Sequence, residues 1–363
     1  MRILVISNAD IGLYKFRKEL LDELVKENEV YIALPKGEFY DELVSIGCHY
    51  IVTELNRHGT NPIKEMKIIF LYKKIIKIVK PDIVFTYTIK PNIYAGMVCA
   101  SLGVPYVANV TGLGTAVENA KFMKLITLNL YRYGLRRAQM VFFQNVENRD
   151  FMISKKIVVG DYKILPGSGV NLDNYTVSEY PNGDTVDFVF VSRIMKEKGI
   201  DQYIDAAKEI RRRHPQTRFH VCGFCEQAYE EKLNELSKTG VIIYHGLVKN
   251  MAEIYRQISC TVHPTYYPEG LSNVLLESAA CGRPIITTNR SGCREVVDDG
   301  VNGYVVEEKN SKDLIEKIEM FLSKSTEERK LMGLAGRKKV EKEFDRKIVI
   351  NAYMKEVELK YEK

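Results

Sequence analysis

Short apolar runs alternate with amphipathic stretches of helical length along the whole sequence of 363 residues. This alternation is typical of parallel β-sheets built from right-handed βαβ units, because two parallel strands need a long crossover between them. We therefore expect an α/β protein with doubly wound sheets. The expected strands of the first half cover residues 3–7, 30–34, 50–53, 83–87, 106–110 and 140–144, with 163–166 as a further candidate. Those of the second half cover residues 187–191, 218–222, 242–245, 261–264, 284–287 and 303–306.

A turn-rich segment divides the chain. The segment PGSGVNLDNYTVSEYP, residues 166–181, favours a linker, and the chain length also suits two domains. We expect one domain over 1–168, a second over 169–345, and a C-terminal helix over 346–363 that packs back towards the first. Doubly wound domains bind ligands at the carboxyl ends of their strands. Two such domains facing each other would form a cleft.

The sequence shows no signal for export or for membrane spanning. The first apolar run ends at Asp10 without the small-residue pattern of signal-peptide cleavage. The longest stretch without charge, residues 91–117, contains four Gly and two Pro, which break it into shorter pieces. The seven Cys are odd in number and scattered, as is usual for reduced intracellular thiols. These features predict a cytoplasmic protein.

Four residues have the spacing of a metal site. Cys222 and Cys225 form a CxxC motif, and Cys260 and His263 follow downstream. However, Cys222 ends one expected strand and Cys260 starts another, two strand spacings or about 9–10 Å away. A zinc ion needs all its ligand atoms within about 2.0–2.3 Å of the metal, so these residues are too far apart. We therefore expect no metal site.

The positive charge is concentrated in one region. Residues 51–150 contain 14 Lys or Arg and 6 Asp or Glu, whereas the rest of the chain contains 39 and 41. A basic patch attracts an anionic partner or surface. No RNP, zinc-finger or helix-turn-helix pattern accompanies it, so nucleic acid is not an expected partner.

The sharpest local feature of this basic region is an amphipathic helix that follows Asn61 and Pro62, which suit its N-cap and first helical position. One broad apolar arc is expected to face the core, formed by Ile69, Leu71, Tyr72, Ile75, Ile76, Ile78 and Val79. The opposite arc mixes lysines with apolar side chains, which suits an ordinary crossover helix or the surface of an anionic bilayer. A second basic stretch, residues 121–137, favours membrane contact. The expected membrane-contact residues are Met66, Lys67, Phe70, Lys73, Lys74 and Lys77.

The segment HPTYYPEGLSNVLLESAACGRPII, residues 263–286, carries the strongest signal for chemistry. A Pro and a Gly flank Glu269, so this residue is expected in a loop. A helix is expected from Leu271 onwards, with Ser272 or Asn273 as its cap. A helix that follows a strand in this way offers free N–H groups to a phosphate.

Carboxylates and cations accompany this helix. Glu269 would lie at the N-terminus of this helix, and Glu277 about a turn and a half along the helix. Ionised carboxylates accept hydrogen bonds from several hydroxyl groups, so the two suit a hydroxyl-rich ligand. A dianionic diphosphate also needs positive charge, which Arg193 and Lys198 supply just after a strand.

In this order and spacing the motifs resemble a retaining, family 4 glycosyltransferase of the GT-B fold, over nearly the entire chain. The resemblance implies two Rossmann-like domains, with the acceptor side in the first and nucleotide-sugar binding in the second. It also implies a metal-independent reaction without a cofactor. The residues that carry it are Ser192-Arg193, Lys198-Gly199, the run from Glu269 to Glu277, Ala280, Gly282, Pro284, Gly292, Glu295 and Gly303.

The resemblance implies a role for each matching residue. Arg193 and Lys198 would neutralise the donor diphosphate and its leaving charge, and Glu269 would contact the transferred sugar, which makes these three the expected catalytic residues. Glu277 would bind the ribose hydroxyls. Gly12, in the loop after the first strand, would let the backbone approach the donor phosphate or the acceptor. The other expected donor-binding residues are Gly270, Leu271, Ser272, Asn273 and Thr111.

The loop after the fifth strand departs from the family pattern. Many relatives have a His there, whereas this loop runs from Asn109 through Thr111 and Gly112 without a general base. A retaining reaction tolerates this, since the resemblance implies front-face attack in which the departing phosphate oxygen takes the acceptor proton. Thr111 or nearby amides would then contact sugar hydroxyls. Arg17 and His58 are the expected acceptor-side residues.

Among relatives, the opening motif from Asn8 to Arg17 and the pattern Arg57…Asn61-Pro62 are most similar to bacterial enzymes that extend polyprenyl-diphosphate-linked oligosaccharides for capsule, O-antigen or protein glycans. The resemblance therefore implies transfer of a hexose or N-acetylhexosamine from a UDP-sugar to a lipid-linked saccharide. Such an enzyme would lie on the inner face of the cell membrane.

Two alternatives stay open, and the motif of a third is incomplete. A nucleotide-sugar epimerase shares the two-domain architecture and would release free epimerised nucleotide sugar. A sugar-nucleotide-binding scaffold would bind the donor without releasing a nucleoside diphosphate. Gly112 and Gly114 begin like the dinucleotide fingerprint of an oxidoreductase, but the third Gly is missing and the motif follows the fifth strand instead of the first.

Overall fold

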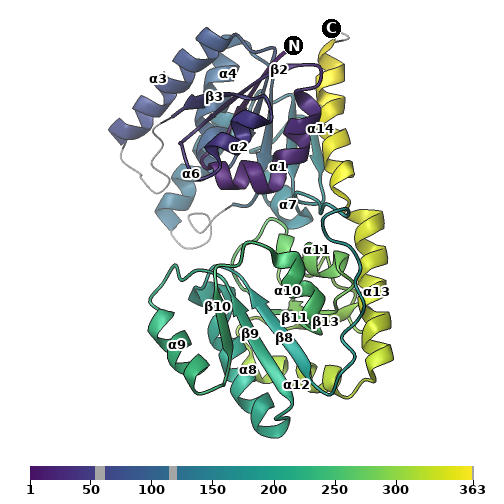
Figure 1. Ribbon diagram of the computed structural model, residues 1–363. Coiled ribbons are helices and arrows are strands. Elements are labelled where there is room, and N and C mark those ends of the chain that lie inside the picture. Colours follow the sequence, from purple (N-terminus) through teal and green to yellow (C-terminus); the bar gives the residue numbers. More distant parts are fainter. Residues whose placement is uncertain (54–61, 114–120, 362–363) are drawn as a thin grey trace. The chain divides into compact units, whose positions relative to one another are not determined.

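The computed structural model describes residues 1–53, 62–113 and 121–361. The chain divides into two compact units (Figure 1). Unit 1 comprises Met1–Ser168 and Lys347–Lys363, and unit 2 comprises Gly169–Arg346. The last residues of the chain therefore belong to the same unit as the first.

The described part of unit 1 contains a seven-stranded parallel sheet, and every strand expected in the first half is confirmed to within two residues. Its strands are β1 (Arg2–Ile6), β2 (Glu29–Leu34), β3 (His49–Val52), β4 (Ile83–Tyr87), β5 (Tyr106–Val110), β6 (Met140–Phe143) and β7 (Tyr162–Ile164). They lie in the order β3-β2-β1-β4-β5-β6-β7. The central strands β4 and β5 are buried along their whole length, as in a sheet covered on both faces.

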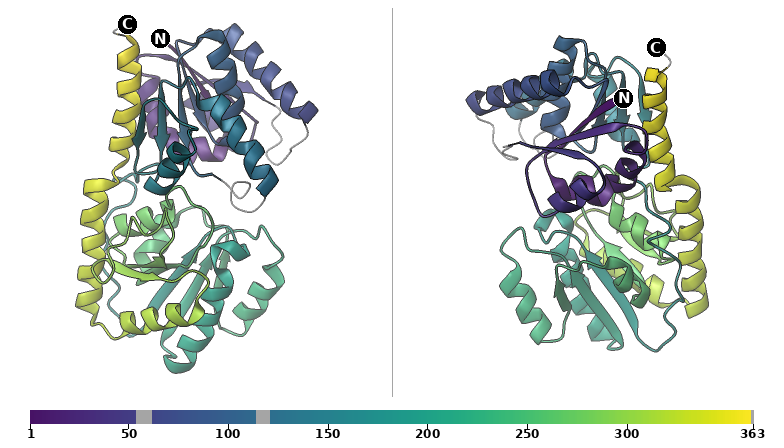
Figure 2. Two further views of the ribbon diagram at one scale, coloured as in Figure 1. Left: turned by 180° about the vertical axis from the view of Figure 1, so that it is seen from behind. Right: turned by 45° about the horizontal axis from the view of Figure 1, so that its top comes forward.

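Helices cover both faces of this sheet (Figures 1 and 2). Leu20, Leu43 and Tyr353 pack against one face, and Tyr72, Val98 and Tyr131 pack against the other. The first face is covered by α1 (Asp10–Leu24), α2 (Tyr40–Ser45) and α14 (Arg346–Tyr361). The second is covered by α3 (Pro62–Val79), the π-helical turn η1 (Pro91–Ala95), α4 (Gly96–Leu102), α6 (Lys121–Leu135) and α7 (Val146–Ser154).

Unit 2 repeats this architecture with a six-stranded parallel sheet in the order β10-β9-β8-β11-β12-β13, and all six strands expected in the second half are confirmed. The strands are β8 (Val186–Val191), β9 (Thr217–Cys222), β10 (Ile243–Gly246), β11 (Cys260–His263), β12 (Ile285–Thr288) and β13 (Gly303–Val306). The helices are the short 3₁₀ turn η2 (Lys196–Lys198), α8 (Ile200–Arg213), α9 (Glu230–Lys238), α10 (Met251–Gln257), α11 (Asn273–Ala280), α12 (Ser311–Leu322) and α13 (Thr326–Glu343).

The strand order fixes where each unit can bind a ligand. β1 lies between β2 and β4, and β8 lies between β9 and β11, so the chain winds outward in both directions from β1 and from β8. Loops that leave neighbouring strands in opposite directions open a crevice at the carboxyl ends of those strands. The crevice of unit 1 is therefore bordered by the loops after β1 and β4, and that of unit 2 by the loops after β8 and β11.

Two expected details are wrong. Gly12 does not lie in a loop, because α1 already begins at Asp10 and places it in the first turn. Ile78 does not face the core but is 68% exposed, because the buried stripe of α3 is narrower than the apolar arc of the sequence. The fully buried positions of α3 are Ile68, Tyr72, Ile75, Ile76 and Val79. Within the described ranges, no helix combines the length and apolar character needed to cross a membrane.

Candidate functional site

The loops after β8 and β11 are joined to each other in unit 2. Gly199 has a left-handed backbone (φ 81°), and a Cβ at this position would clash with the carbonyl oxygen of Pro264. The Tyr266 N–H donates a hydrogen bond to the Glu197 carbonyl at 2.9 Å, and the Thr265 hydroxyl reaches the same oxygen at 3.4 Å. These contacts bring the side chains of the two loops together.

Lys198 and Glu269 form an ion pair between these loops. Their side chains are only 9% and 16% exposed. Burial disfavours the charged form of Glu269, but Lys198 and the other nearby basic groups together outweigh burial, and the pKa of this carboxyl lies below its usual range. The Lys198 ammonium also lies 4.7 Å from the centre of the Tyr267 ring, and the Arg193 guanidinium lies 5.3 Å from the same centre. The structure thus brings together all three expected catalytic residues.

Arg193 has a second partner that the sequence did not indicate. Its guanidinium forms an ion pair with Glu226, in the loop after β9. Backbone hydrogen bonds fix this arrangement, because Ile194 N–H donates to the Phe224 carbonyl at 2.8 Å and Glu226 N–H donates to the Ile194 carbonyl at 3.1 Å. Both charged side chains stay about one-third exposed. The positive charge of Arg193 is therefore balanced within unit 2.

A further loop supports the segment that carries Glu269. Gly292 has a left-handed backbone (φ 90°), and a Cβ there would lie 2.8 Å from the Cβ of Glu269 and from the Gly270 carbonyl. The Gly292 carbonyl accepts a hydrogen bond from Ser272 N–H at 2.8 Å, and the Glu295 carboxylate accepts one from Gly292 N–H at 2.7 Å. Gly292 and Glu295, both part of the sequence motif, thus hold residues 269–272 in place.

The helix after Glu269 begins two residues later than the predicted start at Leu271, at one of the two predicted caps. Glu269 lies in a loop, and α11 starts at Asn273 with Ser272 at the N-cap position. The Ser272 side chain makes no capping bond, and its hydroxyl lies 3.4 Å from His263 Nε2 instead. The first N–H groups of α11 have no acceptor within the helix, and Asn273 Oδ1 is buried without a hydrogen-bond partner among the described residues. Leu271 is buried in the core, so its side chain anchors this loop.

His263 lies close to the ion pair. It ends β11 and is 1% exposed. Burial and the nearby Lys198 ammonium lower the pKa of His263 to about 4. The imidazole is therefore neutral at physiological pH.

Glu277 lies in the second turn of α11 and contacts tyrosines. The Tyr255 hydroxyl donates to its carboxylate at 3.4 Å and also reaches the Val274 carbonyl at 3.3 Å. Tyr175 is the second tyrosine neighbour of Glu277. Burial and the Glu277 carboxylate raise the pKa of Tyr175 well above its usual range. Both phenols stay protonated and can donate. Glu277 is half-buried, so part of its carboxylate stays accessible.

The residues expected in unit 1 lie at different depths. Gly12 has no atom within 4 Å of the position a Cβ would take, so its surroundings are open. Thr111 follows β5 directly and is half-buried. Arg17 is only 4% exposed, and its guanidinium lies 5.2 Å from the centre of the Tyr87 ring, at the end of β4. His58 lies outside the described residues.

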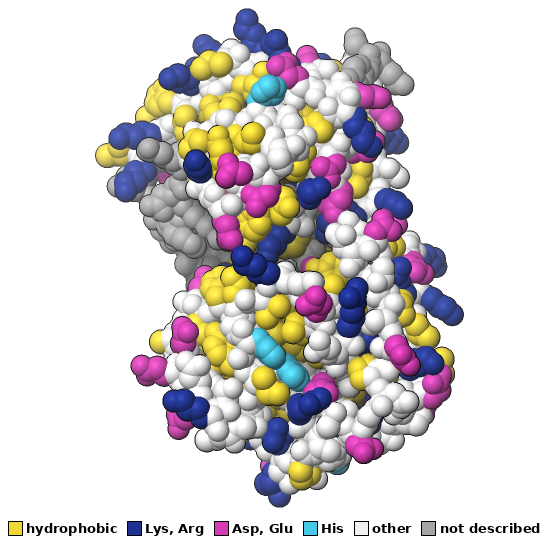
Figure 3. All heavy atoms as spheres, viewed as in Figure 1, with side chains coloured by type: hydrophobic (Ala, Val, Ile, Leu, Met, Phe, Trp, Pro, Cys, Tyr) yellow, Lys and Arg dark blue, Asp and Glu magenta, His cyan; other side chains and the backbone are white. Residues whose placement is uncertain are grey.

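The side chains expected to contact a membrane are all exposed. Met66 is 58% exposed and Phe70 is 63% exposed, and the lysines around them face solvent. Figure 3 shows dark blue lysines mixed with yellow apolar side chains over α3. The exposed lysines of this set are Lys67, Lys73, Lys74 and Lys77. We call these six residues the α3 face.

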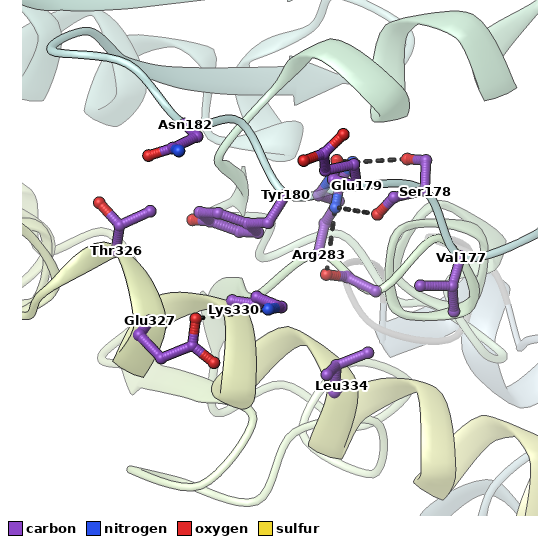
Figure 4. Close-up of a pocket in the computed structure, with 11 residues that line it drawn as sticks. Val177, Ser178, Glu179, Tyr180, Asn182, Arg283, Thr326, Glu327, Lys330 and Leu334 are labelled. Atoms are coloured by element: carbon purple, nitrogen blue, oxygen red, sulfur yellow. Dashed lines mark hydrogen bonds and ion pairs between the residues drawn. The ribbon is translucent and has the colours of Figure 1, made fainter.

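A cavity of about 510 Å³ lies elsewhere in unit 2, between residues 177–182 and α13 (Figure 4). Its buried cation, Arg283, donates to the carbonyls of Ser178 and Tyr255 among other groups and is already satisfied. No expected site residue lines this cavity.

Among the described residues, no three His, Cys, Asp or Glu are placed to hold a metal ion. The order β9-β8-β11 separates the strands of Cys222 and Cys260, as expected.

Two protein families match the sequence. The family described as glycosyl transferase 4-like matches residues 2–145, and the family described as glycosyl transferases group 1 matches residues 175–339. The first match lies in unit 1 and the second in unit 2.

Individual relatives agree with these families. The chain is 25% identical to an N,N'-diacetylbacillosaminyl-diphospho-undecaprenol α-1,3-N-acetylgalactosaminyltransferase from Campylobacter jejuni, over 98% of both chains. It is 31% identical, over 47% of each chain, to the capsular polysaccharide biosynthesis glycosyltransferase CapM from Staphylococcus aureus. The solved structure of Anabaena HepE with UDP and glucose has the same fold, with a TM-score of 0.78 over 98% of this chain and 99% of that one, at 16% identity.

Proposed function

We propose that this chain, which belongs to the glycosyltransferases of the GT-B fold, transfers a hexose or an N-acetylhexosamine from a UDP-sugar to a saccharide on polyprenyl diphosphate. One observation carries the proposal: Arg193, Lys198 and Glu269 meet at the carboxyl edge of the unit 2 sheet, between the loops after β8 and β11. A guanidinium and an ammonium suit a diphosphate, and an ionised carboxylate suits sugar hydroxyls.

When the donor binds, Arg193 and Lys198 would exchange their present charge partners for the diphosphate. Arg193 and Lys198 are paired with Glu226 and Glu269 in the structure. A bound diphosphate would take up both cations, and the N–H groups at the start of α11 would add partial positive charge. Glu269 would then accept hydrogen bonds from the transferred sugar. Glu277, steadied by Tyr255, would accept them from the ribose.

These charges also fit a retaining reaction without a metal. The bond between the anomeric carbon and the diphosphate oxygen breaks, and the bond to the acceptor oxygen forms on the same face. The departing phosphate oxygen takes the acceptor proton, so no side chain has to act as a base. Arg193 and Lys198 would stabilise the charge that develops on this oxygen, a role that a divalent ion fills in other enzymes.

The acceptor and the location rest on the relatives and on the α3 face. The Campylobacter relative is named for a substrate linked to diphospho-undecaprenol, and CapM is named for capsular polysaccharide. HepE was solved with UDP, which supports a UDP-sugar donor. Lysines mixed with exposed apolar side chains support peripheral binding to an anionic membrane. Gly12 and Thr111 stay donor-binding candidates, and Arg17 and His58 stay acceptor-side candidates.

A panel of UDP-, GDP- and ADP-sugars tests the donor. A ligand that binds the native state raises the Tm by mass action, so we expect protection by one or more UDP-sugars and not by the others. Protection by GDP- or ADP-sugars alone would contradict the donor assignment.

Product analysis with the selected donor and a prenyl-diphosphate-linked saccharide tests the reaction. We expect a glycosylated acceptor with retained anomeric configuration, unaffected by EDTA. Free epimerised nucleotide sugar would indicate an epimerase, and donor binding without UDP release would indicate a scaffold. Loss of activity in EDTA with recovery on adding a divalent ion would contradict the metal-independent reaction.

A further inference from the structure

The loop after β4, at the crevice of unit 1, has two uncommon backbone features. Thr88 has a left-handed backbone (φ 72°), which is rare for a β-branched residue and costs about 1–3 kcal/mol. Its hydroxyl oxygen is buried without a hydrogen-bond partner among the described residues. The chain then forms the π-helical turn η1, a rare conformation that occurs frequently at functional sites.

The surroundings hold this loop firmly. Asn92 is fully buried, its N–H donates to the Thr88 carbonyl at 3.1 Å, and its side-chain amide donates to the Asn109 carbonyl at 2.8 Å. Its side-chain oxygen accepts from the Thr86 hydroxyl at 2.7 Å. On the other side, a Cβ at Gly134 of α6 would lie 2.6 Å from the Ile93 carbonyl. Strain that is enforced from several directions is typical of sites that bind ligands.

A half-buried ion pair lies in the same loop. Lys90 contacts Glu65, in the first turn of α3, at 2.7 Å, and the two side chains are only 15% and 13% exposed. Burial and the Glu65 carboxylate raise the pKa of Tyr94, so its hydroxyl stays protonated beside the pair. Removing two charges from water is costly, and a buried ion pair contributes little net stability compared with apolar packing. Stability alone therefore gives no reason for this pair.

We propose that Thr88, Lys90 and Glu65 form the subsite of unit 1 that recognises the sugar ring of the acceptor. An ammonium donates hydrogen bonds, a carboxylate accepts them, and a hydroxyl does both, which together match neighbouring hydroxyls of a sugar. The pair carries no net charge, so it suits a neutral sugar and offers no net attraction to a diphosphate. This inference rests on the proposed function, because it takes the acceptor to be a saccharide.

Calorimetric titration of the full chain separates sugar recognition from diphosphate recognition. The probes are farnesyl diphosphate and farnesyl diphosphates that carry N-acetylglucosamine, N-acetylgalactosamine, glucose or galactose. We expect at least one sugar-bearing probe to bind more tightly than farnesyl diphosphate. Lys90→Gln and Glu65→Gln should weaken that probe by about tenfold or more, because each removes a charge-assisted hydrogen bond. Neither should change the affinity for farnesyl diphosphate or UDP.

Two further variants exclude a purely structural role. The exchange Lys90→Glu with Glu65→Lys keeps an ion pair but swaps its donor and acceptor, so it should fold normally and still lose the preference for the sugar. Lys64→Gln, an exposed neighbour on α3, should behave like the parent. The inference fails if the parent shows no preference for any sugar, or if the variants weaken all probes equally. Failure of UDP to bind the parent would instead contradict the proposed donor, independently of this result.

Discussion

Lys198 is surrounded by groups that hold it in place. The Glu269 carboxylate pairs with it, and the Tyr267 ring faces its ammonium at 4.7 Å. Because the side chain is almost fully enclosed, its position is fixed before any ligand arrives. Preorganised charge of this kind stabilises a transition state more effectively than a mobile surface cation does.

Lys198→Ala should therefore lower kcat by about a hundredfold or more, the usual loss when one preorganised charge-stabilising group is removed. The measurement is the rate of UDP release in the presence of acceptor. Lys196→Ala removes an exposed lysine two residues earlier and is the matched control. Equal rates for Lys198→Ala and the parent would contradict the assignment.

Glu226 competes with the donor for Arg193. The two side chains pair in the structure and both stay about one-third exposed, so the pair is weak and can be exchanged. Glu226→Gln should free the guanidinium and tighten UDP binding by about two- to fivefold, the worth of an exposed pair. Glu230→Gln, an exposed carboxylate at the start of α9, should leave the Kd unchanged. Weaker UDP binding in Glu226→Gln would show that Glu226 positions Arg193 instead.

His263 should make the protein less stable in acid. The pKa of this buried imidazole is lowered to about 4, against about 6.5 in an unfolded chain. Between these values the unfolded state binds a proton that the native state does not, so the free energy of unfolding falls as pH drops from about 6.5 to about 4, by about 3 kcal/mol from this group. His263→Asn should flatten the Tm between these pH values relative to the parent. A parallel Tm curve would contradict the neutral buried ring.

The sequence located part of this site and missed the rest. Arg193, Lys198 and Glu269 could be found because they follow strands within recognisable motifs. Glu226 could not, because its contact with Arg193 depends on β9 lying beside β8. Tyr267 stands two residues before Glu269 in the quoted segment, but nothing in the sequence shows that two cations share its ring.

At the scale of elements, α3 shows which features of a helix its hydrophobic periodicity can predict. The sequence predicted the helix and its lysine-rich outer arc, and both are confirmed. Ile78 was misplaced because helical periodicity alone does not fix how wide a stripe the sheet covers. The π-helical turn η1 was not predicted either, because it results from packing against α6 and from the hydrogen bonds of Asn92.

The lysines of the α3 face allow a test of membrane binding. Changing the four lysines of the α3 face to Glu should weaken binding to vesicles containing phosphatidylglycerol by about a thousandfold or more at low salt, because each lysine near an anionic surface contributes about 1 kcal/mol and about 1.4 kcal/mol corresponds to tenfold in affinity. Sedimentation with vesicles of increasing phosphatidylglycerol content measures this. Unchanged sedimentation of the variant would end the membrane proposal. A control with the same net charge changes the exposed lysines Lys238, Lys249, Lys312 and Lys342 of unit 2 to Glu.

At the scale of the whole molecule, the sequence predicted two doubly wound units, and the structure contains two. Alternating strands and helices predict doubly wound parallel sheets, whereas the strand order of each unit comes from the structure. The contacts of the last helix could not be predicted from the sequence. Tyr353 of α14 is fully buried against Phe85 and Phe142 and accepts a hydrogen bond from the Asn109 side chain at 2.8 Å. No local pattern shows which strands a helix so distant in sequence will contact.

Tyr353→Ala should therefore destabilise unit 1 by about 3–5 kcal/mol, the usual cost of deleting a buried aromatic side chain. Unit 2 should keep its stability, so calorimetry should resolve an early transition followed by one that UDP still protects. Leu359→Ala, at a position of α14 that is 38% exposed, is the control. A single transition shifted as a whole would show that the two units unfold together.

The membership of residues 347–363 in unit 1 has a consequence for biosynthesis. As the polypeptide leaves the ribosome, the strands of unit 1 emerge first, but the aromatic face that Tyr353 covers stays open until all of unit 2 has been translated. During that interval the nascent chain exposes Phe85 and Phe142 to solvent or to chaperones. Premature termination anywhere in unit 2 would therefore also leave unit 1 incomplete and prone to aggregation.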